Sequence, residues 1–372
     1  MSDPVTPAPH PLHARQFGRR LLVGFFLLAL FGWLALRPQV GDDSRLVVRE
    51  FFGMGTLLSV SVYRDGAQNP ADLEISLDAV ETLLRDYEQR WSAWGNGALG
   101  EINQRLGAGE AAPIPESMRA LFAAAAHYGR LSQGRFDVRL GRLVEIWGFD
   151  DEQHFLSAPP GAASISAALA DLQAAPPLHE AALAYGPAPG LRLDFGAIAK
   201  GDAVDQVVAQ LHAAGYPHVI VNAGGNLRAA GRRGQRAWRI GIRHPRPNPQ
   251  QPVLATLEIK GDEAVVTSGD YERGFDYEGR RYHHLLDPRS GMPARGLQAV
   301  TVVAATAALA DAASTALFVA GPQHWRAVAA ALQLDQVMVV DETGLALATP
   351  RLSARLNYAA GVRHSVAPDI PP

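Results

Sequence analysis

Apolar and polar positions follow two different periods along the chain, and each period predicts a different kind of element. Between residues 73 and 91 the apolar positions recur every three or four residues, which is the spacing of one buried helix face. Before this stretch, residues 46–52 and 57–63 are strand-like and are separated by a Gly-rich turn. The pattern therefore predicts two strands followed by a long amphipathic helix. Its apolar stripe consists of Leu73, Leu77, Val80, Leu84, Tyr87 and Trp91.

The rest of the chain mixes strands and helices. Apolar periodicity predicts a helix at 115–131, and it predicts two more at 307–320 and 324–332. No internal repeat and no inter-domain linker interrupts the pattern. We therefore predict an α+β fold, a single mixed α/β catalytic domain over residues 46–360 with a largely antiparallel sheet core. Strands are predicted at 218–222, 238–243, 253–259, 264–267, 282–286 and 299–304.

The N-terminal part has a different character. Residues 21–36 form an uninterrupted apolar run that is closed by Arg37, slightly short of the ~20 residues of a typical membrane span. No small-residue cleavage pattern follows, so we predict an uncleaved transmembrane signal anchor at 21–37. Basic residues are concentrated before the run, which places residues 1–20 in the cytoplasm as a tail. The expected localisation is the inner membrane, single-pass, with the catalytic domain in the periplasm.

Composition narrows the choice of function. The formal net charge is −3 without a long run of either sign, which argues against a nucleic-acid partner. The sequence has no cysteine, so disulfides, thiolate metal sites and a cysteine nucleophile are excluded.

The first candidate site is the stretch from residue 191 to residue 205. Leu191 and Leu193 form a β-like pair that leads through a small-residue turn into a helix. Gly196 and Gly201 allow a close backbone approach, and Lys200 adds a positive charge near the helix N-terminus. Such an N-terminus suits a phosphate or pyrophosphate, although the spacing matches neither the Walker nor the dinucleotide pattern. A structural strand–turn–helix corner with a solvated lysine is the alternative.

The second candidate site lies inside the helix predicted at 307–320. Asp311 is too far into this helix to cap it, a role better suited to Thr306. A buried carboxylate costs several kcal/mol unless it is compensated. Asp311, Ser314 and Thr315 lie on one helix face and can present three oxygens to one point, which suits a hard cation such as Mg²⁺. An Asp satisfied by backbone and hydroxyl groups is the alternative.

The third candidate is the strand end around residue 284. His284 precedes Asp287 by three residues, and in a kinked strand end both can face one cavity. A histidine there can act as a general base near neutral pH. Neighbouring residues of a strand point to opposite faces, which argues against a zinc site made of His283 and His284.

Taken together, these segments resemble the FAD:protein FMN transferase family. The resemblance covers about residues 46–350, and its motifs follow in the order expected for that family. They are 54–56, 91–94 with 101–103, 136–138 with 147–149, 194–205, 224–226, 268–271, 284–288 and 310–315.

The resemblance implies a function and a set of site residues. The implied reaction is the Mg²⁺-dependent transfer of the FMN moiety of FAD onto a Ser/Thr hydroxyl of a target flavoprotein, with release of AMP. The implied partner is an FMN-acceptor domain of a membrane redox protein. His284 would activate the attacking hydroxyl, and the Mg²⁺ ligands would be Asp311, Thr315 and the carbonyl of Ala197, with Ser314 in the same set. The implied FAD-binding residues are Met54, Trp94, Arg135, Phe136, Asp137, Asp194, Lys200 and Leu286.

The chain departs from the family in two respects. Some members carry a second acid where Ser314 stands, so the metal site would have one charge less. Many members carry a lipid-attachment cysteine, whereas this chain has the apolar run at 21–36. Two other functions are alternatives. An FAD pyrophosphatase that gives FMN and AMP would use the same metal and helix, whereas a non-catalytic periplasmic FAD-binding protein would need no metal on Asp311 and Thr315.

Overall fold

The computed structural model describes residues 45–371 with the exception of 67, 152–154 and 247–248. The predicted cytoplasmic tail at 1–20 and the predicted anchor at 21–37 lie outside the described residues. Within the described part, no helix combines the length and the apolar character needed to cross a membrane.

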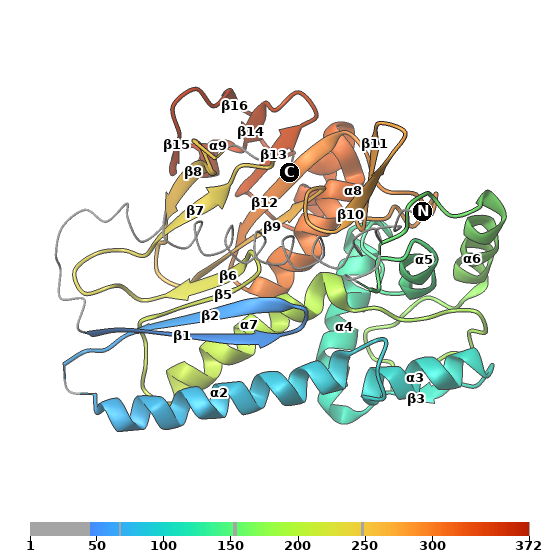
Figure 1. Ribbon diagram of the computed structural model, residues 1–372, viewed down its shortest axis with the longest axis horizontal. Coiled ribbons are helices and arrows are strands. Elements are labelled where there is room, and N and C mark those ends of the chain that lie inside the picture. The colour runs from blue at the N-terminus through green and yellow to red at the C-terminus, as the bar shows by residue number, and fades with distance from the viewer. Residues whose placement is uncertain (1–44, 67, 152–154, 247–248, 372) are drawn as a thin grey trace, which may run out of the picture. The chain divides into compact units, whose positions relative to one another are not determined.

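A nine-stranded sheet forms the centre of the fold (Figure 1). Every neighbouring pair is antiparallel except β14 and β16. This arrangement confirms the predicted mixed fold with a largely antiparallel sheet. In spatial order the strands are β1 (Leu46–Gly53), β2 (Thr56–Tyr63), β5 (Val219–Ala223), β6 (Asn226–Ala230), β9 (Glu263–Gly269), β12 (Leu297–Ala304), β13 (Val337–Asp341), β14 (Ala346–Ala348) and β16 (His364–Val366).

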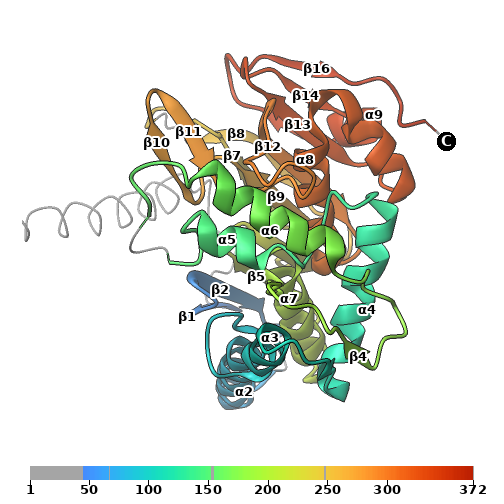
Figure 2. The same cartoon turned by 90° about the vertical axis from the view of Figure 1, so that its right-hand side faces the viewer.

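Three long helices cover one face of this sheet. They are α2 (Pro70–Trp91), α7 (Gly196–Ala213) and α8 (Ala307–Ala331), and their apolar faces share one core with the sheet. Four further helices gather at one end of the domain, toward the viewer in Figure 2. These are α3 (Ala98–Gly107), α4 (Glu116–Leu131), α5 (Gly141–Ile146) and α6 (Ala162–Ala174), with the short pair β3 (Ala112–Pro113) and β4 (Ala184–Tyr185).

A smaller sheet covers the opposite face. It consists of β15 (Leu356–Tyr358), β8 (Val253–Glu258) and β7 (Arg239–Arg243). The central strands are therefore buried on both faces: in β12, Val300 and Val302 pack with the helices, whereas Ala299 and Val303 pack with the small sheet. Such strands are apolar throughout rather than alternating. The other elements are the hairpin β10 (Gly274–Tyr277) and β11 (Arg280–His283), and the short helix α9 (Pro350–Ser353).

The predicted helices agree with the structure more closely than the predicted strands do. All six residues of the apolar stripe in α2 are buried. The two helices predicted at 307–320 and 324–332 follow one another across a kink at Gly321, where φ is 71°, before Pro322.

Two strand predictions were wrong. β11 ends at His283 rather than at residue 286, and Leu286 makes only an isolated bridge with Pro293. The β-like pair Leu191 and Leu193 is not a strand, because the segment makes only an isolated bridge between Arg192 and Leu140.

Candidate active site

The turn that opens α7 is shaped by Asp194. Its Oδ1 atom accepts a hydrogen bond from the Gly196 N–H at 2.8 Å, which turns the chain into the helix. Four residues into α7, the Lys200 Nζ atom donates to the Gly196 carbonyl at 2.8 Å. The lysine charge is thereby held over the first turn of α7, where the helix dipole already favours an anion.

Asn103 joins this turn to the loop after α2. Its Nδ2 atom donates to the carbonyls of Ala93 (3.3 Å) and Leu193 (3.0 Å), and its Oδ1 atom accepts from the Leu193 N–H at 2.8 Å. In that loop, the predicted FAD contact Trp94 is 38% exposed, and the Arg192 guanidinium lies 5.0 Å above its ring. A partly exposed aromatic ring is thus held near the start of α7.

A second connection brings residues 135–138 to the same turn. The Val138 carbonyl accepts from the Asp194 N–H at 2.7 Å. Of the FAD contacts predicted in this segment, Phe136 is buried and Asp137 forms an ion pair with Arg139 at 2.7 Å. Arg135 keeps a buried Nε atom that has no hydrogen-bond partner in the described part of the chain. Arg135 is therefore the residue here with donor capacity for an anion.

Asp311 is fixed by α7. Thr306 caps α8 by accepting from the Leu309 N–H, as predicted, so Asp311 lies in the second turn and is 4% exposed. Its Oδ2 atom accepts from the Gly201 N–H at 3.0 Å. In a regular helix this N–H points at the Ala197 carbonyl. The Asp311 carboxylate and the Ala197 carbonyl, both predicted metal ligands, therefore lie around the same N–H group.

Burial raises the pKa of Asp311 above its usual range, and the positive charge of Lys200 partly offsets this effect. Asn226 of β6 lies beside the carboxylate and also favours its charged form. The Asn226 Nδ2 atom is nevertheless buried without a hydrogen bond of standard geometry to any described residue. The buried carboxylate is therefore surrounded by polar groups that favour its charged form, and a further positive charge beside it would stabilise it. Asn226 belongs to a motif of the sequence but was not predicted as a site residue.

The hydroxyl groups near Asp311 form a second cluster of oxygens. Ser314 is fully buried and donates to the Asp311 carbonyl at 3.0 Å, so Ser268 must donate to Ser314 across 2.8 Å. Thr315 is half-buried, and its Oγ1 atom lies 3.4 Å from the Ser268 hydroxyl. Thr315 is thus less committed to protein partners than Ser314. Ser268, at the end of β9, was not among the predicted site residues.

The donor set fits a hard cation. One carboxylate, neutral hydroxyls and a backbone carbonyl are the oxygen ligands that Mg²⁺ uses together with water and substrate phosphates. In the described ranges, no group of three or more His, Cys, Asp and Glu side chains is arranged to hold a metal ion. A cation at Asp311 would therefore depend on neutral oxygens for its remaining protein ligands.

His284 follows the end of β11. Its backbone N–H and its Nδ1 atom both approach the Arg273 carbonyl, at 3.2 and 3.3 Å. Because a carbonyl only accepts, Nδ1 carries the proton and Nε2 keeps a free lone pair. Burial lowers the pKa of His284 well below its usual value, and the charges of Arg273 and Lys200 lower it further. The imidazole is therefore neutral at pH 7 and can accept a proton at Nε2.

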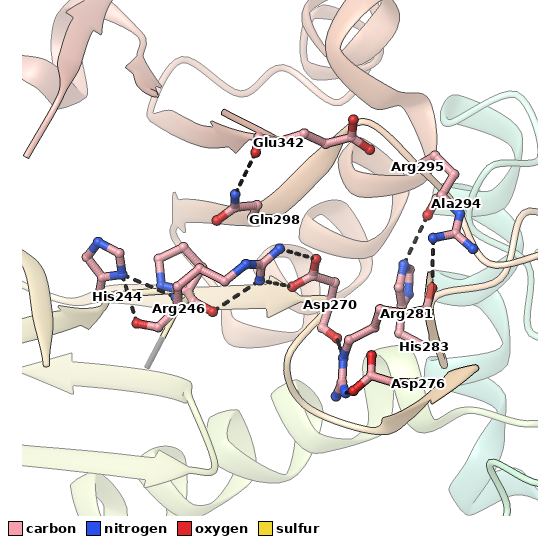
Figure 3. A network of polar contacts seen from close by, with 11 residues as sticks. His244, Arg246, Asp270, Asp276, Arg281, His283, Ala294, Arg295, Gln298 and Glu342 are labelled. Carbon is pink, nitrogen blue, oxygen red and sulfur yellow. Dashed lines mark hydrogen bonds and ion pairs between the residues drawn. The ribbon is translucent and has the colours of Figure 1, made fainter. Parts of the chain in front are cut away.

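His283 points elsewhere, as predicted for neighbouring strand residues. Its Nε2 atom lies 3.0 Å from the Ala294 carbonyl, and burial lowers its pKa to about 4 (Figure 3). The same view shows Arg246 bound to both carboxylate oxygens of Asp270, at 2.6 and 2.8 Å, and Arg281 bound to the Asp270 carbonyl at 3.0 Å. This network holds the β10–β11 hairpin, and with it the strand end that carries His284.

The structure thus brings three predicted residues together from distant segments. The positive charge of Lys200 lowers the pKa of both His284 and Asp311. Asp287 instead binds Arg289 of its own turn at 2.8 Å. Leu286 is buried in the main core, close in sequence to His284.

Met54 lies at the tip of the β1–β2 hairpin with φ of 52°, and its N–H donates to Glu88 at 3.0 Å. The next residue but one, Thr56, packs against Gly224, so closely that a Cβ atom on Gly224 would lie 2.4 Å from the threonine hydroxyl. The hairpin tip therefore adjoins the β5–β6 turn, which leads to Asn226 and Asp311.

Comparison with known proteins gives a consistent picture. A relative named FAD:protein FMN transferase from Rhodobacter capsulatus is 35% identical over 320 residues, which cover 85% of this chain and 59% of the relative. One of the same name from Treponema pallidum is 35% identical, with 72% of this chain and 77% of the relative covered. This chain therefore spans less than two thirds of the Rhodobacter protein but most of the Treponema protein.

Solved structures show the same fold. The flavinyl transferase ApbE of Pseudomonas stutzeri, in its apo form, has a TM-score of 0.71 at 32% identity, with 85% of this chain and 98% of that chain covered. The ApbE protein of Thermotoga maritima has a TM-score of 0.73 at 29% identity, with 83% and 99% covered. The ApbE family model matches residues 54–339, a range that includes every predicted site residue. The chain therefore belongs to the ApbE family of flavin transferases.

Proposed function

We propose that this chain is an FAD:protein FMN transferase that uses Mg²⁺ and places FMN on a Ser/Thr hydroxyl of a target flavoprotein. The hydroxyl oxygen would attack the FMN-side phosphorus of FAD. The phosphoanhydride bond would break, and AMP would leave with the bridging oxygen. The main support is that the start of α7 joins the two candidate groups: its Gly201 N–H binds the buried Asp311 carboxylate at 3.0 Å, and its Lys200 is held over the first turn by the Gly196 carbonyl at 2.8 Å. The charge of Lys200 also lowers the pKa of both His284 and Asp311.

Phosphoryl transfer requires neutralised charge and an in-line arrangement more than covalent help from the protein. The first turn of α7 and Lys200 would bind the pyrophosphate. Asp311, Thr315 and the Ala197 carbonyl would hold Mg²⁺, which supplies charge neutralisation when bound. Ser314 would support this set through its hydrogen bonds to Ser268 and to the Asp311 carbonyl.

His284 would take the proton of the acceptor hydroxyl. Its Nδ1 atom is held by the Arg273 carbonyl, which leaves the Nε2 lone pair for the proton. Nearby cations and burial keep the imidazole neutral, so it needs no prior deprotonation at pH 7. The remaining predicted contacts would contribute to the binding of FAD, and they are Met54, Trp94, Arg135, Phe136, Asp137, Asp194 and Leu286.

Mass spectrometry tests the proposal against its alternatives. The full chain is incubated with FAD, Mg²⁺ and an FMN-binding domain of a membrane redox protein as acceptor. We expect an FMN adduct on a Ser or Thr of the acceptor and one AMP per adduct. Free FMN and AMP without an adduct would indicate the pyrophosphatase, and intact FAD bound to the chain would indicate a non-catalytic binding protein.

We also propose that residues 21–37 anchor the protein in the inner membrane and that the domain over 46–360 lies in the periplasm. The support is the apolar run at 21–36 and the basic residues before it. Cell fractionation should find the full-length protein with the membranes. A soluble form that begins after about residue 37 would contradict the anchor.

A further inference from the structure

We infer that Asp205 is a positioning residue that fixes α8 against α7 and so holds Asp311 toward the Ala197 carbonyl. The inference rests on the proposed function, because it concerns the proposed Mg²⁺ ligands. Asp205 is not itself a ligand in that proposal, and it acts through the backbone of α8.

Asp205 and Gly201 form two successive contacts with α8. They are four residues apart and therefore lie on the same face of α7, as Ala307 and Asp311 do on α8. Gly201 N–H binds the Asp311 carboxylate at 3.0 Å, and one turn further along α7 the Asp205 carboxylate binds the start of α8. The two helices are thus held in antiparallel register at two points, one of which is Asp311 itself.

The Asp205 carboxylate binds the N-terminus of α8 with both oxygens. Oδ1 accepts from the Ala307 N–H and Oδ2 from the Ala308 N–H, each at 2.9 Å. Thr306 accepts from the Leu309 N–H, so the first three N–H groups of α8 all have partners. A negative charge at this end also interacts favourably with the helix dipole. The contact is therefore specific for a carboxylate.

Asp205 is in turn oriented from β6. The Arg228 Nη1 atom donates to Asp205 Oδ1 at 2.7 Å, and Arg228 also binds Asp262 through Nε and Nη2, both at 2.8 Å. Arg228 and Asn226 are two residues apart on β6 and therefore lie on one face of the sheet. The same strand thus contacts Asp205 through Arg228 and lies beside Asp311 through Asn226.

Register matters here because an α-helix rises 1.5 Å per residue. A slip of α8 along its axis by this rise would lengthen and bend the 3.0 Å contact of Asp311 with Gly201, and so weaken it. The donor oxygens of α8 would then no longer lie around the Ala197 carbonyl. Asp205 should therefore set the affinity of the metal site rather than the chemical step.

The test is Asp205→Asn in the full chain, with Mn²⁺ binding followed by electron paramagnetic resonance. An amide can accept from only one of the two α8 N–H groups and presents a donor to the other. Loss of a partner that orients metal ligands typically weakens metal binding about 10–100-fold, and we expect an Mn²⁺ Kd raised about tenfold. In the transfer assay, the Mg²⁺ concentration for half-maximal rate should rise similarly, while the rate at saturating Mg²⁺ stays within about twofold.

Asp262→Asn is the matched control. It removes the same charge from the same network, but its carboxylate accepts hydrogen bonds from Arg228 rather than from the start of α8. We expect Mn²⁺ affinity within about twofold of wild type. Equal weakening in the two variants would contradict the role of Asp205, because it would point to a general effect of charge.

Several outcomes separate this inference from others. If Asp205→Asn lowers the free energy of unfolding but leaves Mn²⁺ affinity unchanged, Asp205 is merely structural and the inference fails. If wild-type protein binds no Mn²⁺, the proposed metal site fails and the inference fails with it. If Asp205→Asn does not fold, Arg228→Met replaces it: we expect about threefold weaker Mn²⁺ binding, and unchanged affinity would overturn the inference.

Discussion

The contact between α7 and α8 can be tested by adding one methyl group at Gly201. A Cβ atom there would lie 2.2 Å from the Ala307 carbonyl oxygen and 2.8 Å from the Ala308 nitrogen, and both atoms belong to backbone. Real Cβ atoms essentially never approach closer than 3.0 Å, so α8 would have to move by about 0.8 Å or more. We therefore expect Gly201→Ala to separate the two helices.

Three contributions set the size of the effect. Overpacking costs about 1–3 kcal/mol, and the upper end applies because backbone cannot rotate away. Lengthening the 3.0 Å bond from Gly201 N–H to Asp311 weakens a buried charged hydrogen bond, at about 1–2 kcal/mol. Replacing glycine by alanine inside a helix stabilises the helix by about 1 kcal/mol, because alanine has the higher helix propensity. The net expectation is a loss of about 3 kcal/mol in the free energy of unfolding.

Urea denaturation of the full chain measures this loss, and Gly107→Ala is its matched control. Gly107 is the last residue of α3, and a Cβ atom there would meet nothing within 4 Å. The same substitution should therefore stabilise by about 0.5–1 kcal/mol at Gly107. The change in the free energy of unfolding should therefore be negative for Gly201→Ala and positive for Gly107→Ala. If Gly201→Ala is as stable as wild type and binds Mn²⁺ normally, the contact between α7 and α8 does not position the proposed metal ligands.

Five further variants test the site and its pH dependence. Asp311→Ala should abolish metal-dependent transfer in a folded protein, because it removes the charged ligand of the proposed site. Thr315→Ala should weaken Mg²⁺ binding less, because only a neutral oxygen is lost. If Asp311→Ala unfolds the domain but the fraction that remains folded transfers FMN normally, the carboxylate is structural. Lys200→Ala should mainly weaken FAD binding, by about 1–3 kcal/mol in a calorimetric titration, since a charge-assisted hydrogen bond is lost. His284→Ala should keep FAD and Mg²⁺ affinity but slow adduct formation by about 10²–10⁴-fold, and loss of FAD binding with a normal rate at saturation would reverse the two roles. The pKa of His283 is about 4 in the folded chain, below the ~6.5 of an unfolded histidine, so between these two pH values the unfolded chain binds one proton more. The free energy of unfolding should therefore fall by up to about 3 kcal/mol as pH falls from ~6.5 to about 4. Urea titrations of His283→Asn at several pH values should show a smaller dependence of this free energy on pH.

Local patterns in the sequence predicted the elements that depend on local rules. The stripe of α2 and the Thr306 cap of α8 follow from periodicity and capping, and both were confirmed. The opposite directions of His283 and His284 follow in the same way from strand geometry. β6 was missed because Asn226–Ala230 contains no β-branched or aromatic residue, and its pairing with β5 and β9 comes from the sheet.

Local rules could not predict the contacts that build the candidate site. Asp311 pairs with a backbone N–H that lies 110 residues earlier, and Asn103 with Leu193, 90 residues later. Neither pairing has a local signal, because it depends on which segments the fold brings together. What sequence could indicate was that a carboxylate inside an apolar helix needs a partner, since an unpaired buried charge is costly.

The role of Gly201 shows how a correct local reading can still leave the partner open. A glycine beside Lys200 at a helix start indicated close backbone approach, as at phosphate sites. In the structure the close neighbour is the first turn of α8, and the N–H of Gly201 binds Asp311. Neighbouring residues of α7 therefore have different roles. The charge of Lys200 lowers the pKa of His284 and Asp311, whereas Gly201 and Asp205 form hydrogen bonds with α8. Because Gly201 and Asp205 are one helical turn apart and Lys200 is offset by one position, a single turn of α7 can position the proposed metal ligands and still hold the Lys200 charge where we propose that the pyrophosphate binds.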